Sequence, residues 1–250
     1  MGVTAAERAA HEIAHGRLLA EGDPERAWGW ATPAGQLRAR RRSELLVQQA
    51  GIGPTSRVLE VGCGTGLFTA ALAATGADVV AVDVSDALLE RARARGLDPA
   101  HVRLECARIE VLGETERFDA VVGSSVLHHL DLRAALPQIH DLLNPGGWMV
   151  FAEPNGLNPQ VWLERRLKPL RVRRHLSMDE TAFSRWAIAG QLTELGFEDV
   201  KVTPFDWLHP STPGACIRVM SALGNAMERV PLVREFAGCL LVRARRGTYW

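Results

Sequence analysis

The chain has 250 residues, 47% of them hydrophobic, which is enough apolar material for one sizeable core and predicts one compact unit with additions rather than two domains. Its formal net charge is zero, so no overall field points to nucleic acid, and we expect no nucleic-acid partner. The four cysteines have no metal-type spacing, so we expect no metal.

The first fifty residues carry two helical patterns with an irregular link between them. Apolar side chains recur at helical spacing over residues 4–20 and again over 36–50. The link, residues 22–35, holds Trp28 and Trp30, which either form a pocket wall or only anchor the helices to the core. The second helix carries four arginines on its early turns, where we expect a solvated face rather than an anion site: Arg38, Arg40, Arg41 and Arg42.

Residues 58–66 read Val-Leu-Glu-Val-Gly-Cys-Gly-Thr-Gly and predict a buried strand that ends in a glycine-rich turn, with a helix over about 67–75. The three glycines allow sharp turning and close approach of a ligand to the backbone. Their spacing is Gly-x-Gly-x-Gly, which differs from the dinucleotide spacing Gly-x-Gly-x-x-Gly, and Glu60 stands two residues before the first of them. Glycines alone fit an ordinary strand-to-helix turn equally well.

A second apolar strand, residues 77–82, ends in Asp83, 17 residues after Gly66. An acid at this strand tip is placed to accept hydrogen bonds from a ribose diol. With the glycine turn, this pattern resembles the class I S-adenosylmethionine-dependent methyltransferases.

That resemblance implies an α/β fold, a doubly wound Rossmann-like sheet of seven strands in the order 3-2-1-4-5-7-6 with strand 7 antiparallel. It implies S-adenosyl-L-methionine as the cofactor, S-adenosyl-L-homocysteine as its product and no metal. The residues expected to hold the cofactor are Glu60, Gly62, Cys63, Gly64, Gly66, Asp83, Val84, Ile109 and Ser124.

The third strand is expected over residues 102–106, after a helix over 86–95 that Ser85 can cap. The family usually places an aspartate shortly after this strand, where it holds the adenine amino group, but Arg108 occupies that position here. Glu110 or Glu105 supplies the acceptor instead, or adenine is held by backbone and apolar contacts such as Ile109.

The fourth strand, residues 118–123, leads into the loop 124–130, Ser-Ser-Val-Leu-His-His-Leu. This loop resembles that of the small-molecule branch of the family. It does not resemble the Asn/Asp-Pro-Pro-aromatic loop of enzymes that methylate amide or base nitrogens. A helix over 132–143, a turn over 144–147 and a strand over 148–152 follow, with Glu153 at the tip of the strand.

His128 and His129 stand at the end of the fourth strand and Glu153 at the end of the fifth, so the carboxylate can face one of the two imidazoles. Sugar and aglycone O-methyltransferases of natural-product pathways, which this arrangement resembles, use a histidine base with an acid. On that resemblance we favour His129 as the base. A purely structural histidine, or one that contacts the methionine part of the cofactor, is the alternative.

Residues 154–175 concentrate basic side chains among aliphatic ones, and a solvated face, an anionic-substrate clamp and a membrane-surface element all stay open. Trp30, Arg173 and Arg174 are the substrate-contact candidates. The remaining elements are a helix over 177–196, a strand over 200–205, an amphipathic helix over 211–230 and a last strand over 238–243.

These observations predict a methyltransferase that modifies a small-molecule, lipid-linked or sugar-linked acceptor, with O-methylation expected. The alternatives are a cofactor-binding regulator without activity, or N- or C-methylation. Residues 1–50 are expected to form a helical lid and residues 51–250 the methyltransferase domain, with insertions at 154–175 and 206–235. An anionic acceptor, peripheral membrane contact and a homodimer stay open. With no signal-peptide pattern and no bilayer-length apolar run, we expect a cytoplasmic location.

Overall fold

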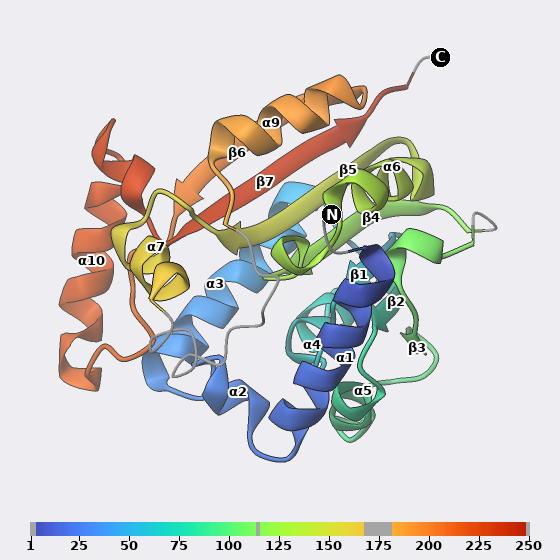
Figure 1. Ribbon diagram of the computed structural model, residues 1–250, viewed down its shortest axis with the longest axis horizontal. Coiled ribbons are helices and arrows are strands. Elements are labelled where there is room, and N and C mark those ends of the chain that lie inside the picture. The colour runs from blue at the N-terminus through green and yellow to red at the C-terminus, as the bar shows by residue number, and fades with distance from the viewer. Residues whose placement is uncertain (1–3, 114–115, 168–181, 249–250) are drawn as a thin grey trace.

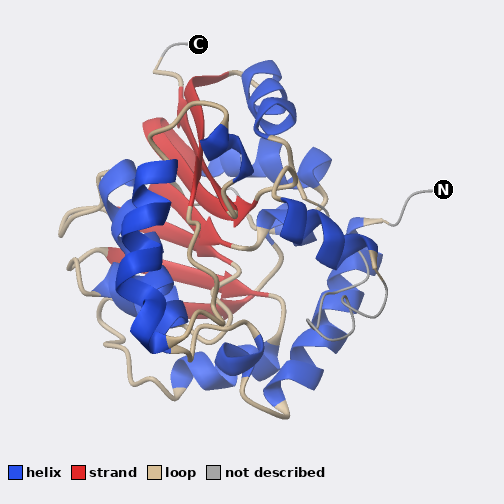
Figure 2. Cartoon of the chain, turned by 90° about the vertical axis from the view of Figure 1, so that its left-hand side faces the viewer, coloured by secondary structure: helices blue, strands red, loops and turns tan. Residues whose placement is uncertain are grey.

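A computed structural model gives the fold and describes residues 4–113, 116–167 and 182–248. Within these ranges the strands form one twisted sheet in the order β3-β2-β1-β4-β5-β7-β6, with helices on either side (Figures 1 and 2). The strands are β1 (Arg57–Val61), β2 (Asp78–Asp83), β3 (Val102–Cys106), β4 (Phe118–Ser124), β5 (Leu143–Pro154), β6 (Phe197–Phe205) and β7 (Cys239–Arg246). The predicted order is confirmed, and β7 pairs antiparallel with both β5 and β6 as expected.

The helices cover the two faces of the sheet in separate groups. Side chains of α3 (Pro33–Ala50), α4 (Leu67–Ala73) and α5 (Asp86–Arg93) share one buried cluster with Val58 of β1. Side chains of α6 (Leu132–Leu142) and α9 (Arg185–Glu194) share another with Leu59. Neighbouring residues of a strand point to opposite faces, so a strand buried on both sides reads as the continuous apolar run of the sequence.

The N-terminal segments differ in how they join this core. Helix α1 (Ala5–Ala20) begins at a capping box of Thr4 and Glu7, and its Gly16 packs closely against Ser85 and Leu88 near α5. A short helix α2 (Pro24–Ala27) follows. Helix α3 packs directly against one face of the sheet, because its Leu46 is buried in the cluster that includes Val58. The division into a lid and a domain at residue 50 stays a prediction.

Two further helices follow β5 and β6, namely α7 (Pro159–Arg166) and α10 (Ile217–Met227). The 3₁₀ turns are η1 (Ile109–Val111) after β3, η2 (Leu127–His129) after β4, η3 (Gly214–Cys216) before α10 and η4 (Val233–Phe236) before β7. None of the helices in the described ranges is long and apolar enough to cross a bilayer.

Some boundaries differ from the predictions. Strand β5 begins at Leu143, because Leu143 already pairs with Phe118, and the predicted turn over 144–147 is an irregularity within the strand where Gly146 has φ +81°. Helix α10 is shorter than predicted. Ser85 stands at the N-cap of α5 but its hydroxyl makes no capping bond. The backbone amide of Ser85 donates to Oδ1 of Asp83.

Candidate functional site

A cavity of about 650 Å³ lies beyond the carboxyl ends of β1, β2 and β4. This is the edge of a doubly wound sheet at which ligands bind, and the volume lies within the range of about 300–1,000 Å³ typical of small-molecule sites. Its walls come from α1, the link after α2, α7 and the loop that follows β6. The predicted site residues that line it are Trp30, Gly62, Cys63, Gly64, Asp83, Val84, Ile109, Ser124, His128 and His129.

The glycine turn has the backbone that only glycine adopts easily. Gly62, Gly64 and Gly66 have φ of +69°, +53° and +77°. A Cβ atom at Gly62 would lie 2.4 Å from the side chain of Val126, and one at Gly64 would lie 3.2 Å from the ring of Trp28. The turn therefore needs glycine both for its conformation and for the close packing around it.

The amides of this turn are already used within the protein. Gly62 and Cys63 donate to the carbonyl oxygen of Val82 at 2.8 and 3.1 Å, and Gly64 donates to Oδ2 of Asp83 at 2.8 Å. A phosphate site presents free backbone amides to the anion, and these three are committed elsewhere. The turn thus fits close approach of an uncharged nucleoside part better than a pyrophosphate.

Asp83 is held so that it can accept further hydrogen bonds. Its Oδ2 takes the amide of Gly64 and its Oδ1 takes the amide of Ser85, each at 2.8 Å, which leaves lone pairs on both oxygens. Burial raises the pKa of Asp83, and the two amide bonds act in the opposite direction. The buried hydroxyl of Ser85 beside it has no hydrogen-bond partner among the described residues. A ribose diol would satisfy these groups.

The two histidines of the loop after β4 have different carboxylate partners. Nδ1 of His128 lies 2.7 Å from Oε2 of Glu153, and both side chains are almost fully buried. Nδ1 of His129 lies 3.0 Å from Oε1 of Glu12 on α1. The His–Glu pair expected from sequence therefore exists, but it involves His128 and not the favoured His129. His129 and Glu12 both line the cavity, as His128 does.

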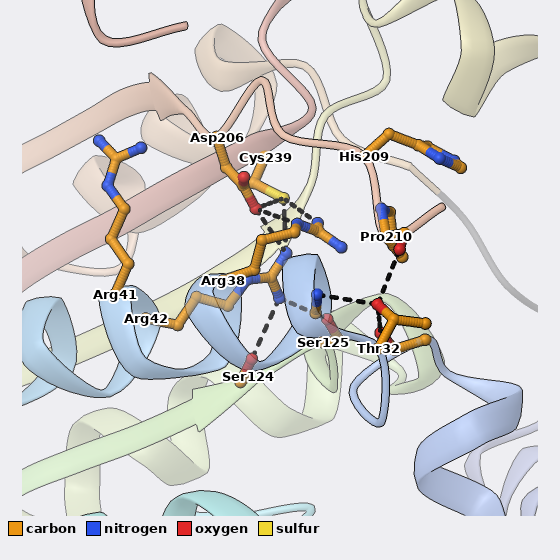
Figure 3. A network of polar contacts seen from close by, with 12 residues as sticks. Thr32, Arg38, Arg41, Arg42, Ser124, Ser125, Asp206, His209, Pro210 and Cys239 are labelled. Atoms are coloured by element: carbon orange, nitrogen blue, oxygen red, sulfur yellow. Dashed lines mark hydrogen bonds and ion pairs between the residues drawn. The ribbon is translucent and has the colours of Figure 1, made fainter. Parts of the chain in front are cut away.

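Two arginines of α3, Arg38 and Arg42, line the cavity. Figure 3 shows both directed toward Asp206 and Cys239. Arg42 is only 3% exposed, and its Nη1 donates to the hydroxyls of Ser124 and Ser125 at 3.2 and 3.0 Å. Nε of Arg38 donates to Oδ2 of Asp206 at 2.8 Å. The expected solvated face is thus wrong for these two residues, which the core and the end of β6 bury.

One carboxylate serves both guanidinium groups. Nη2 of Arg42 lies 3.7 Å from Oδ2 of Asp206 and 2.6 Å from the sulfur of Cys239. Burial raises the pKa of the Cys239 thiol, which keeps it neutral. Trp30 lies 5.4 and 4.9 Å from the guanidinium carbons of Arg38 and Arg42. Asp206 is therefore shared by Arg38 and Arg42, and the charge of Arg42 also acts on the pKa of Glu153.

Three predicted residues lie behind the lining. Glu60 is 2% exposed within β1, where burial raises its pKa to about 7. Gly66 starts α4, and Glu153 acts on the cavity through His128. Arg173 and Arg174 lie outside the described residues. Trp30 lines the cavity and also packs edge-on against Phe68, so its wall and anchor roles coincide.

The region after β3 shows which of the residues considered for adenine contact line the cavity. Ala107 and Ile109 line the cavity, whereas Arg108 pairs with Glu110 at 3.5 Å and neither of them is in the lining. Glu105 pairs with Arg103 instead. The backbone and apolar alternative is the one that the geometry favours.

Sequence reasoning missed several lining residues, among them Glu12 and His15 of α1 and Trp207 after β6. No sequence pattern marked them, because they reach the cavity only through tertiary packing. No group of three His, Cys, Asp or Glu side chains in the described ranges is arranged to hold a metal ion.

Residues 30–202 match the family model described as a methyltransferase domain. The chain is 31% identical over 150 residues to Nodulation protein S of Rhizobium tropici, and the match covers 58% of this chain and 61% of that protein. It is 33% identical over 126 residues to the ubiquinone biosynthesis O-methyltransferase of Bordetella avium, covering 49% and 52%. The match thus spans about three fifths of the length of Nodulation protein S and about half of that of the ubiquinone biosynthesis O-methyltransferase. The fold resembles that of N-methyltransferase NodS from Bradyrhizobium japonicum WM9 in complex with S-adenosyl-L-homocysteine, with a TM-score of 0.63, 21% identity and coverage of 94% and 97%.

Proposed function

The chain belongs to the class I S-adenosylmethionine-dependent methyltransferases, and from this premise we propose that it methylates a hydroxyl group of a small-molecule, lipid-linked or sugar-linked acceptor. The observation that carries the proposal is a single cavity that holds a nucleoside-type cradle at Asp83 and a buried imidazole at His128. A nucleoside cofactor and a proton acceptor are the two things that such a reaction needs from the protein.

Four features of the cavity support S-adenosylmethionine as the cofactor. Asp83 would accept the ribose hydroxyls, and Ala107 and Ile109 would line the adenine ring. Arg42, fixed by two serine hydroxyls at the end of β4, would bind the carboxylate of the methionine part.

His128 is the better base of the two histidines on this geometry. Hydrogen bonding of Nδ1–H to the Glu153 carboxylate selects the tautomer with its lone pair on Nε2 and stabilises the imidazolium that forms. Nδ1 of His129 instead faces Glu12 of α1, which suits His129 to holding α1 over the cavity.

Bound S-adenosylmethionine would supply the electrophilic methyl group of its sulfonium, and its sulfur would keep the electron pair of the broken carbon–sulfur bond. The hydroxyl proton passes to His128. Trp28 and Trp30 line the cavity together with residues of α1, and would help to align the acceptor with the methyl group. A neutral amine acceptor would lose its proton after attack and need no base, so the buried His–Glu pair favours a hydroxyl.

The test is methyl transfer from labelled S-adenosylmethionine to a panel of hydroxylated acceptors and their amino analogues. We expect hydroxyl acceptors to be methylated and the rate to depend on His128. Transfer to amines alone, unaffected by His128→Ala, would leave an N-methyltransferase. Cofactor binding without transfer to either panel would favour the regulator.

A further inference from the structure

Helix α10 presents its apolar side to the outside. Val219 is 68% and Leu223 is 52% exposed, while the buried residue of the helix is Gly224, where a Cβ atom would lie 3.0 Å from Trp207. A surface helix of a globular protein normally buries its large apolar residues and exposes polar ones. This reversed arrangement indicates that the apolar side is made to meet something else.

The exposed apolar surface extends beyond α10. Nδ2 of Asn158, the cap of α7, donates to the carbonyl oxygen of Phe236 at 2.7 Å, and the amide of Arg234 donates to Val230 just after α10. Helices α7 and α10 accordingly lie at the same end of the molecule, on the left of Figure 1. We call the following set the α10 face: Trp162, Val219, Met220, Leu223, Leu232 and Phe236, all at least 40% exposed.

Arginines without an acidic partner lie around the α10 face. Glu228 is paired with Arg41, and Glu235 with Arg185, which neutralises these two acids. Arg218 and Arg229 are exposed and have no acidic partner among the described residues. On α7, exposed Arg166 stacks on Trp162 at 4.7 Å. The face therefore combines apolar and aromatic side chains with unpaired arginines.

We propose that the α10 face binds the surface of a membrane that contains anionic lipids. Apolar side chains enter the headgroup region while arginines meet lipid phosphates, which is how interfacial helices bind. A second copy of the chain fits less well. A two-fold interface would set the arginines of one α10 face against those of the other.

The same segments also wall the cavity. Val161 and Arg165 of α7 and residues 207–210 before α10 line it, while the neighbouring residues form the α10 face. On the proposed methyl transfer, the acceptor is then an amphiphile taken from the membrane, with its reactive hydroxyl entering the cavity. This assignment of the acceptor rests on the proposed function, but membrane binding itself does not.

Sedimentation with vesicles tests the proposal on the full chain. We expect binding to vesicles of equal parts phosphatidylcholine and phosphatidylglycerol, weak binding to phosphatidylcholine alone, and release by salt. Val219→Asp should lower partitioning roughly tenfold. Val111→Asp is the matched control, because Val111 on η1 is 69% exposed, about as much as Val219, and lies outside the α10 face. This variant should leave partitioning unchanged.

The charge component has its own pair of variants. Arg218→Ala with Arg229→Ala should lower partitioning into the mixed vesicles roughly 25-fold, because each arginine contributes about fivefold. Arg93→Ala with Arg133→Ala, on α5 and α6, changes the net charge equally and should have no effect.

Several results would overturn the proposal. Absence of the wild type from the mixed vesicles would do so, and so would a loss of binding in Val111→Asp as large as that in Val219→Asp. A dimer in light scattering that Val219→Asp splits, without vesicle binding, would make the α10 face a self-association surface. Circular dichroism confirms that each variant is folded. Vesicle binding by a protein that transfers no methyl group would overturn the proposed function alone.

Discussion

Nδ1 of His128 lies 2.7 Å from Oε2 of Glu153, and the other oxygen of the same carboxylate accepts the amides of Val126 and Leu127 at 3.0 and 2.9 Å. One buried carboxylate thus fixes both the loop after β4 and the imidazole that the loop carries. Burial raises the pKa of Glu153, and the two amide bonds act against that rise. The loop and the orientation of the imidazole depend on each other through this residue.

The first prediction follows from that geometry. His128→Ala should lower the turnover of a hydroxyl acceptor about 10²- to 10⁴-fold, because no base then takes the proton in the transition state. The affinity for S-adenosylhomocysteine should change little. His129→Ala is the neighbouring comparison and should affect turnover less. A larger turnover loss from His129→Ala would return the role of base to His129.

Gly16 gives a prediction about the cover formed by α1. A Cβ atom there would lie 2.3 Å from the hydroxyl of Ser85, so Gly16→Ala should push α1 away and lower the free energy of unfolding by about 1–3 kcal/mol. Gly190→Ala is the control, since a Cβ there meets nothing within 4 Å, and in a helix it should stabilise by up to about 1 kcal/mol. Urea unfolding of both variants makes the comparison. Equal effects would mean that α1 does not pack as described.

The buried carboxyl of Glu60 predicts a pH dependence. Its pKa in the folded protein is about 7, above the ordinary 4.5, so the folded state keeps a proton that the unfolded chain releases. This contribution to stability is fully present below pH 4.5 and is lost as the pH rises to about 7, by up to about 3 kcal/mol.

Glu60→Gln should remove this loss, which urea unfolding across the same pH range would measure. Glu90→Gln, on the exposed side of α5, should leave the pH dependence of the wild type unchanged. If Glu60→Gln loses stability with rising pH as steeply as the wild type, Glu60 is ionised in the folded protein.

Arg42 predicts a difference between two ligands. Arg42→Ala should weaken binding of S-adenosylhomocysteine by about 2–5 kcal/mol, because a buried charge-assisted contact to a carboxylate is lost. Binding of 5′-methylthioadenosine, which lacks the amino-acid part, should change much less. Competition titrations with both ligands check this, and Arg42→Lys keeps the charge if the alanine variant does not fold. An equal loss for both ligands would show that Arg42 only supports the fold.

The glycine turn and Asp83 could be predicted from sequence because their signals are local. A strand, a turn and the acid at the tip of the next strand lie within 26 residues, from Val58 to Asp83, and their spacing is typical of one family. The family resemblance then supplied the order of the sheet.

The arginine cluster could not be predicted in that way. Arg42 stands in a run of arginines that looks solvated, and the group that buries it includes Cys239, 197 residues further along the chain. The choice between His128 and His129 also needed the structure. The two histidines are neighbours in the turn η2, and only its geometry directs one to Glu153 and the other to Glu12.

Calorimetric titration with S-adenosylhomocysteine tests most directly the claim that this cavity holds S-adenosylmethionine. The wild type should bind one molecule per chain. Asp83→Asn should weaken binding by about 1–3 kcal/mol, because one ribose acceptor is lost, while Asp86→Asn, on the exposed start of α5, should not. No binding by the folded wild type, or equal affinity in wild type and Asp83→Asn, would contradict the account.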